Sequence, residues 1–206
     1  THNAGGGTIY PLATIQAIRA VANAHRVPMH LDGARLFNAV VASGVSAADY
    51  AHYFETVTFC LSKGLGAPAG SLIATDDPTI LERLRRFRRM YGGAMRQSGI
   101  LAAAGLYALE HHIPRLANDH AHATRLAARL HQIASVAINP AAVETNILFF
   151  DVHHPRLTAS AFVTALRQEG VLLNAVNART CRAVTHLDVS TDAIDQAADA
   201  IARILA

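Results

Sequence analysis

One residue of this chain points to amine chemistry, both by its type and by its rarity in the sequence. Lys63 is the only lysine, so every other basic side chain among the 18 lysines and arginines is an arginine. A guanidinium stays protonated in proteins, whereas a lysine amine can lose its proton and act as a nucleophile. Codon bias and chance would produce the same scarcity, so the count by itself leaves both interpretations open. The residues around Lys63 favour the chemical one.

The sequence around Lys63 predicts the end of a strand. Residues 57–61 alternate between apolar and polar or small side chains, and Gly64 and Gly66 predict a tight turn directly after the lysine. In open α/β sheets, ligands bind at the carboxyl ends of strands. Amines at such places form Schiff bases with carbonyl compounds, among them pyridoxal phosphate (PLP).

A carboxylate follows the preceding predicted strand. Asp32 comes directly after residues 27–31, so two adjacent strand ends would place Asp32 and Lys63 on opposite sides of one small pocket. A PLP enzyme needs a carboxylate to keep the pyridine nitrogen protonated, because the protonated ring accepts the electrons of the reaction. An aspartate after a strand is often only a helix cap. Asp32, Arg35 and Lys63 together, in this order, indicate a PLP site much more strongly than Asp32 alone.

These residues lie in a segment where predicted strands and helices alternate. The predicted strands are residues 27–31, 57–61 and 71–74, and the predicted helices are one that begins at Pro11 and those at 36–42, 47–54, 78–90 and 98–110. This alternation predicts an α/β domain with a mostly parallel sheet.

The pattern changes near Pro114. Predicted helices follow at 116–133, after Thr158 through Gln168, and after a Thr191 cap to Leu205, with predicted strands at 146–152, 171–174 and 182–186. This order predicts a compact α+β unit. We therefore expect residues 1–115 to belong to a large domain and residues 116–206 to form a small C-terminal domain.

Composition excludes some classes of protein. About half of the 206 residues are hydrophobic, which suffices for a packed core, but no apolar run is long enough for a membrane helix. Cys60 and Cys181 lie in apolar, strand-like settings, which predicts buried thiols in a reducing, cytoplasmic compartment. The chain begins at Thr1 without a signal peptide, and we expect a preceding N-terminal part of a longer protein.

Charge and histidine content suggest two other functions, and both are weakly supported. The net charge is +3, and the only dense basic run, residues 83–89, fits a solvated helix face with Leu81, Leu84 and Phe87 packed inward better than it fits nucleic acid. Twelve histidines invite a metal hypothesis, but none forms the i, i+4 pair with a nearby glutamate that is typical of a helical zinc site. We expect solvated helix and loop histidines and no metal.

Several segments together resemble one enzyme family. Residues 30–39 read HLDGARLFNA and residues 61–71 read LSKGLGAPAGS, and further matches are THN at 1–3, GGAMRQ at 92–97 and VTHLD at 184–188. This chain closely resembles the low-specificity L-threonine aldolases, which are PLP enzymes with the aspartate-aminotransferase-like fold. The resemblance covers essentially the whole chain. It implies the C-terminal part of a PLP-dependent transferase-like large domain plus a small α+β domain.

The resemblance also implies roles for individual residues. Lys63 would be the Schiff-base lysine, Asp32 the partner of the pyridine nitrogen, and Arg35 a neighbour of the 3-oxygen of the cofactor. Arg182 would hold the carboxylate of the amino-acid substrate. Arg96 matches an arginine that approaches the cofactor phosphate from a neighbouring subunit, which implies a homo-oligomer, a dimer or a tetramer. His2 is a candidate participant in catalysis, while the base itself stays unassigned.

The chain departs from the family at two points. It lacks the N-terminal part that supplies a glycine-threonine phosphate loop and a ring-stacking histidine, and Ala94 stands where a third glycine is usual. The implied reaction is retro-aldol cleavage of L-threonine or L-allo-threonine to glycine and an aldehyde. Alternatives are a PLP-dependent β-eliminating lyase on the same fold, and a non-catalytic assembly subunit or nucleic-acid-binding basic protein.

Overall fold

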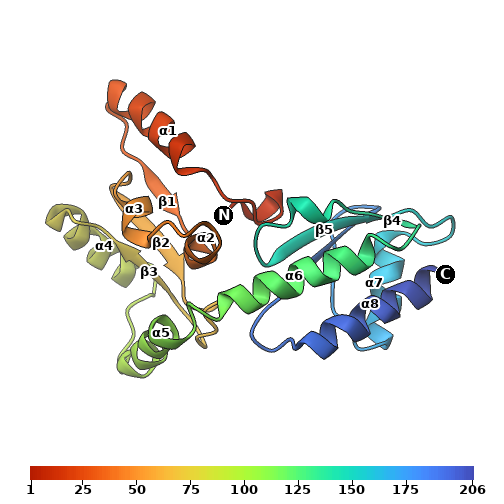
Figure 1. Ribbon diagram of the computed structural model, residues 1–206. Helices are drawn as coiled ribbons and strands as arrows, with labels where there is room; N and C mark the ends of the chain where they lie inside the picture. Colours follow the sequence, from red (N-terminus) through yellow and green to blue (C-terminus); the bar gives the residue numbers. More distant parts are fainter. The chain divides into compact units, whose positions relative to one another are not determined.

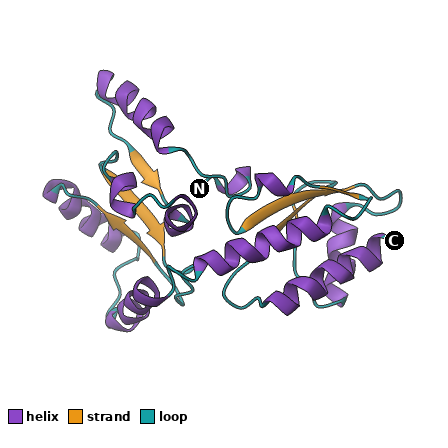
Figure 2. Ribbon diagram, viewed as in Figure 1, coloured by secondary structure: helices purple, strands orange, loops and turns teal.

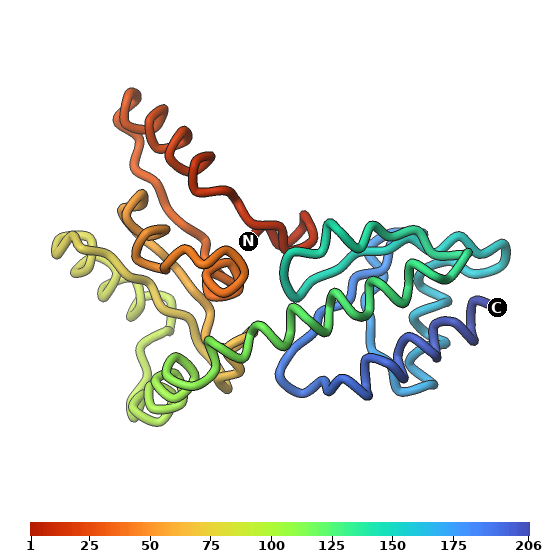
Figure 3. The backbone as a smooth tube through the Cα atoms, in the orientation of Figure 1, coloured from red at the N-terminus to blue at the C-terminus, as the bar shows by residue number.

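The computed structural model describes all residues from 1 to 206, and they form two compact units (Figures 1 and 3). The first unit contains Thr1 and Tyr10–Arg115, and the second contains His2–Ile9 and Leu116–Ala206. None of the helices combines the length and the apolar character that a membrane span requires.

The first unit is built on a mixed three-stranded sheet in the order β1-β2-β3 (Figure 2). Strand β1 (His30–Asp32) runs parallel to β2 (Thr56–Cys60), and β3 (Ser71–Ala74) pairs with β2 in the antiparallel direction. The expected parallel arrangement therefore holds for β1 and β2 but not for β3. A parallel crossover takes roughly a dozen or more residues, and the segment 61–70 is too short to provide one.

Strand β1 begins later than the sequence pattern indicates, and Pro28 explains the shift. Proline has no N–H to donate to a sheet. The next N–H, of Met29, donates to the Glu55 carboxylate at 2.6 Å instead of to a strand. The same carboxylate pairs with Arg19 at 2.7 Å, so it ties the entry of β1 to the first helix. The hydrogen bond from Arg19, followed by that from Met29, lowers the pKa of Glu55 to about 2.

Five α-helices accompany this sheet. They are α1 (Leu12–Ala24), α2 (Leu36–Ser43), α3 (Ala47–Ala51), α4 (Pro78–Met90) and α5 (Gly99–His111). Helix α4 begins where the sequence predicts, because the Asp77 side chain accepts hydrogen bonds from the first-turn N–H groups of Thr79 and Ile80. The expected inward packing of α4 is wrong for Leu81 and Phe87, which are 36% and 38% exposed, whereas Leu84 is half-buried.

The second unit carries an antiparallel sheet of four strands in the order β4-β5-β7-β6. The strands are β4 (Val136–Ala137), β5 (Ile147–Val152), β6 (Asn174–Ala175) and β7 (Thr180–Val184). Helices α6 (Leu116–Leu130), α7 (Ala159–Gln168) and α8 (Thr191–Leu205) supply the rest of its core. Leu148, Phe150 and Val152 alternate along β5 and are all buried in that core. The opposite face of β5 carries the buried Ile147 and the half-buried Phe149 and Asp151.

Local boundaries in this unit differ from the expected ones. Strand β7 begins at Thr180 and ends before Thr185, and β6 is shorter and later than the predicted strand at 171–174. Ser190, not Thr191, caps α8, because its side chain accepts a hydrogen bond from the N–H of Ala193. The Thr158 cap of α7 is confirmed.

The N-terminal segment, His2–Ile9, packs on the second unit and includes the 3₁₀ helix η1 (Asn3–Gly5). Thr145, which leads into β5, donates a hydrogen bond from Oγ1 to the carbonyl oxygen of Gly7 at 2.7 Å. Gly7 has φ +75°, and a Cβ atom there would clash with Thr145 Oγ1. Figure 3 shows this red segment beside the teal strand β5. Only glycine at position 7 allows so close an approach.

The two cysteines are free and differ in burial. Cys181 lies fully buried in β7, and burial, with a smaller contribution from Asp151, raises its pKa to about 11. Cys60 at the end of β2 is only half-buried. The expectation of buried thiols is therefore confirmed for Cys181 but not for Cys60.

An ion-pair network joins α6 to α8 and yields a pH-dependent prediction. Arg125 binds the Asp195 carboxylate through two hydrogen bonds of 2.8 and 2.7 Å, and Arg129 adds a third of 3.1 Å. The hydrogen bond from Arg125 is the largest cause that lowers the pKa of Asp195 from 3.8 to about 2. Because the folded-state pKa is depressed, this stabilisation is present above pH 4 and disappears as pH falls through about 2.

We expect Asp195→Asn to lower the melting temperature at pH 7 and to have little effect near pH 2. Thermal unfolding followed by circular dichroism at several pH values measures this difference. Asp199→Asn, which leaves the pair with Arg125 intact, is the control and should cost less at pH 7. An equal loss of melting temperature at pH 7 and pH 2 would contradict the assignment.

Candidate active site

Lys63 lies in the first unit, three residues beyond the end of β2, with its side chain exposed. Its carbonyl oxygen accepts a hydrogen bond from the N–H of Gly66 at 2.8 Å, which closes a tight turn. A second hydrogen bond, from Ala67 N to Leu61 O at 3.0 Å, joins the residues before and after the turn. Within the turn, Gly66 adopts φ +71°. The backbone that carries the amine is thus fixed, while the amine itself faces solvent.

Asp32 is the last residue of β1 and is also exposed. Its Oδ1 accepts a hydrogen bond from the N–H of Ala34 at 3.2 Å. The next residue, Gly33, donates to Thr58 O of β2 at 2.7 Å, and a Cβ atom on it would lie 2.7 Å from that oxygen. Glycine therefore lets the chain leave β1 tightly against β2. Since β1 and β2 are parallel, Asp32 at the end of β1 and Lys63 just after β2 lie at the same end of the two strands.

The turn at Gly33 and Ala34 separates Asp32 from Arg35, which stands at the N-cap position of α2 without a side-chain capping hydrogen bond. Asp32 and Arg35 therefore lie three residues apart where the chain leaves β1.

Arg96 is placed differently. It lies in the exposed turn between α4 and α5, beside Gln97, which has the unusual φ of +48°. Asp32 and Lys63 lie at the same end of the parallel strands β1 and β2, whereas Arg96 lies in the segment between two helices.

Arg182 and His2 belong to the second unit. Arg182 lies on β7 opposite Phe149 of β5, and its Nη2 donates to Asn3 Oδ1 at 3.1 Å. Its Nε is buried without a hydrogen-bond partner. A guanidinium that is held at one end and has a vacant buried donor is well suited to a carboxylate ligand.

The backbone of His2 is held in a small loop next to Asn3. His2 N donates to Thr8 O at 2.8 Å, and His2 O accepts hydrogen bonds from Gly5 and Gly7. A Cβ atom on Gly5 would lie 2.6 Å from the His2 Nδ1 atom, so the imidazole packs directly on this glycine. Sequence reasoning gave Asn3 no role, although it stands in the THN segment that carries part of the resemblance.

The donor set of the first unit suits PLP. Its residues offer an amine for an aldehyde, a carboxylate for a protonated ring nitrogen and a guanidinium for an anionic ring oxygen, through Lys63, Asp32 and Arg35 respectively. The first two lie at the same end of the parallel strands β1 and β2, and the third follows Asp32 by three residues. These groups can hold the ring of PLP.

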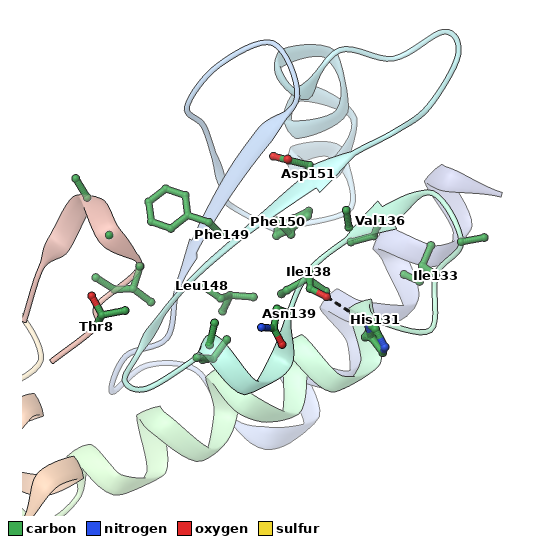
Figure 4. Close-up of a pocket in the computed structure, with 18 residues that line it drawn as sticks. Thr8, His131, Ile133, Val136, Ile138, Asn139, Leu148, Phe149, Phe150 and Asp151 are labelled. Atoms are coloured by element: carbon green, nitrogen blue, oxygen red, sulfur yellow. Dashed lines mark hydrogen bonds between the residues drawn. The ribbon is translucent and has the colours of Figure 1, made fainter.

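A cavity with a volume of about 820 Å³ lies elsewhere, in the second unit (Figure 4). Figure 4 shows Phe149 and Asp151 on β5 and Thr8 of the N-terminal segment at its wall. None of the predicted site residues lines it. Its polar side chains are already engaged: Asp151 Oδ1 accepts from Thr180 at 2.5 Å, and His131 Nδ1 pairs with Ile138 O at 3.2 Å. We therefore place the candidate active site at the strand ends and not in this cavity.

Several histidines are less solvated than expected. His112 and His122 are half-buried and hydrogen-bonded to Leu65 O and Thr191 Oγ1, at 2.6 and 3.1 Å. Burial lowers the pKa of the half-buried His120. The structure contains no group of three or more histidine, cysteine, aspartate and glutamate side chains arranged to hold a metal ion.

Comparison with known proteins places this geometry in a family. The low-specificity L-threonine aldolase 1 of Arabidopsis thaliana is 40% identical over 192 residues, which cover 93% of this chain and 53% of that protein. The low specificity L-threonine aldolase of Escherichia coli is 39% identical over 198 residues, or 96% of this chain and 56% of that protein. This chain thus spans about half the length of the curated relatives it matches.

Solved structures share the fold. A crystal structure of a candidate L-allo-threonine aldolase from Listeria monocytogenes superimposes with a TM-score of 0.80 at 19% identity, over 98% of this chain and 59% of that one. The α/β fold class expected from the sequence is confirmed. The sequence profile of the beta-eliminating lyase family matches residues 1–153. The chain therefore belongs to the beta-eliminating lyase family.

Proposed function

We propose that this chain is part of a PLP-dependent lyase that cleaves L-threonine or L-allo-threonine to glycine and an aldehyde. The observation that carries the proposal is the position of Asp32 at the carboxyl end of β1 and of Lys63 just beyond the carboxyl end of the adjacent parallel strand β2. The named L-threonine aldolases that match more than nine-tenths of the chain support the choice of substrate.

The residues of the first unit bind and tune the cofactor in this proposal. PLP, when bound, supplies an electron sink for the pair released when the Cα–Cβ bond breaks. Lys63 would hold the cofactor through its amine, the group that the amine of the substrate would replace. Asp32 keeps the ring nitrogen protonated through its negative charge, and Arg35 donates to the 3-oxygen. Arg96 approaches the phosphate from a neighbouring subunit.

The residues of the second unit bind the amino acid. Arg182 holds the α-carboxylate, with Asn3 fixing one end of the guanidinium so that its remaining N–H groups are available. His2 precedes Asn3 in the chain, and we propose that it takes part in the transfer of the β-hydroxyl proton. A base must remove that proton before the Cα–Cβ bond can break, and we do not assign the base to a single residue.

The proposed assembly is a homo-oligomer, a dimer or a tetramer, in the cytoplasm. Arg96 supports the first point, because its exposed side chain in the turn between α4 and α5 is available to a neighbouring subunit. Both cysteines are free thiols, which fits a reducing compartment.

Product analysis tests the proposed reaction. The complete protein, loaded with PLP and given L-threonine, should release glycine and acetaldehyde in equal amounts. A β-eliminating lyase would instead release a keto acid and ammonia, and its detection without glycine would overturn the proposal. Release of no product, together with salt-dependent binding to duplex DNA, would favour a nucleic-acid-binding protein.

We expect Arg182→Lys to weaken amino-acid binding about tenfold or more without changing PLP content. Lysine cannot make the planar two-point contact with a carboxylate. Titration with glycine and the KM for threonine measure the effect. Arg179→Lys, in the exposed turn before β7, is the matched control. Unchanged glycine affinity in Arg182→Lys, with a loss of affinity in Arg179→Lys, would shift the carboxylate role to Arg179.

A further inference from the structure

We propose that His112 is a positioning residue for Lys63. Its imidazole lies at the C-terminal end of α5 and bonds to the backbone of the turn that carries the amine, so that it fixes where Lys63 can reach. The role assigned to Lys63 rests on the function proposed above. The contact that carries the inference belongs entirely to the first unit.

The contact is a short hydrogen bond between distant parts of the sequence. His112 Nδ1 lies 2.6 Å from the carbonyl oxygen of Leu65, two residues after Lys63. A carbonyl oxygen can only accept, so Nδ1 must carry the proton and donate it. Leu65 is only 3% exposed, and its carbonyl oxygen receives none of the backbone hydrogen bonds of the turn. His112 therefore satisfies a buried acceptor that the turn itself leaves open.

A second contact brings the same helix face against the other side of the turn. Gly105 of α5 is buried, and a Cβ atom there would lie 3.0 Å from Leu61 Cδ1. Gly105, Ala108 and His112 recur at a spacing that places them on one face of a helix. Ala108 is 1% exposed, which marks this face as packed along its length. Helix α5 (Figure 1) thus holds Leu61 before the lysine and Leu65 after it.

The imidazole is itself oriented by a neighbour. The rings of Tyr107 and His112 meet edge to face, with centroids 5.4 Å apart. The adjacent His111 also contacts the Tyr107 ring, with centroids 4.4 Å apart, but it is exposed and its charge partner, Glu110, is 3.9 Å away. Two consecutive histidines of equal chemistry therefore differ in one respect that matters here: only His112 bonds to the turn of Lys63.

The test uses nearly isosteric replacements in the complete protein. Asparagine at position 112 can offer an N–H at the place of Nδ1, whereas aspartate of the same shape offers only acceptor oxygens. The variants are His112→Asn and His112→Asp, with His111→Asp as the control for an added negative charge. The first measurement is hydrogen exchange at the amides of Gly66 and Ala67, without cofactor, and the second is affinity for PLP by absorbance titration.

We expect His112→Asp to raise exchange at both amides and the Kd for PLP by about tenfold, the effect of losing one buried hydrogen bond and adding a repulsion. His112→Asn should stay close to the unaltered protein in both measurements, and so should His111→Asp. Equal behaviour of the Asn and Asp variants would overturn the inference, because the hydrogen-bond donor is lost only in the Asp variant and His111→Asp controls for its charge. Faster exchange with unchanged PLP affinity would also overturn it, since His112 would then be structural only.

The two proposals fail in different ways. If the unaltered protein does not take up PLP on Lys63, the proposed function falls, and the positioning role falls with it. If the unaltered protein takes up PLP on Lys63 and the His112 variants match it, only the positioning role falls. The fold of each variant is checked by thermal unfolding, and the comparison of Asn with Asp remains decisive even if a larger change at this position prevents folding.

Discussion

Lys63→Ala is expected to abolish covalent cofactor loading and to reduce threonine cleavage on the order of 10³-fold or more, as removal of a catalytic nucleophile does. Lys63 offers the only side-chain amine of this chain, so no neighbouring group can replace it. Lys63→Arg should be no better, because a guanidinium does not lose its proton and cannot attack an aldehyde. The loss is chemical, since the side chain is exposed and its removal leaves no cavity.

Borohydride reduction in the presence of PLP tests directly whether the cofactor is attached to Lys63. Reduction should fix the mass of the cofactor on the peptide that contains Lys63, in the unaltered protein and in a Ser62→Ala control. Ser62 is exposed and precedes the lysine, so this control perturbs the turn without removing the amine. Recovery of the cofactor on a peptide without Lys63 would refute the central role of this residue.

The elements that could be predicted from the sequence are those set by local chemistry. Helix α4 begins and ends where expected, because Asp77 and Pro78 specify its first turn within a few residues. Strand β3 coincides with the predicted range of residues. The errors come from residues whose effect depends on a partner. Pro28 delays β1 because the Glu55 carboxylate, distant in sequence, takes the N–H of Met29.

The candidate site shows the same difference between features set by local sequence and features set by distant partners. The position of Asp32 and Lys63 at strand ends follows from alternation and glycine turns, which are local signals. Two contacts were beyond such reasoning: Asn3 with Arg182, and His112 with Leu65. They join residues far apart in sequence, so only packing brings them together. Paired histidines on a helix carry no local sign of which one will be buried.

The buried polar groups of the second unit show how the N-terminal segment is kept near Arg182. Thr145 holds Gly7, while the neighbouring Asn146 donates from Nδ2 to Thr185 O at 2.8 Å, just beyond β7. Thr145, Asn146 and Thr185 are all at most 2% exposed. Hydrogen bonds at such buried sites are costly to break. The sheet that carries Arg182 and the segment that carries Asn3 are therefore fixed to each other within this unit.

Asp32→Asn is expected to keep PLP bound and to lose most of the rate. The amide keeps an oxygen that can accept from Ala34, so the turn after β1 should persist. It lacks the negative charge that holds the ring nitrogen protonated. Loss of one charge-assisted hydrogen bond costs about 1.5–3 kcal/mol, which corresponds to a rate loss of roughly 10- to 150-fold. The weaker electron sink adds to this loss, because the ring then accepts the released electron pair less readily.

The comparison that isolates the charge is Asp32→Asn against Asp32→Glu. Glutamate keeps the charge but moves it by one methylene, so it should retain more of the rate than asparagine does if charge dominates over position. The kcat for glycine release and the PLP content of each variant give the answer, and thermal unfolding confirms that both remain folded. A kcat for Asp32→Asn close to that of the unaltered protein, at full PLP content, would remove Asp32 from the mechanism, because a neutral amide cannot keep the ring nitrogen protonated.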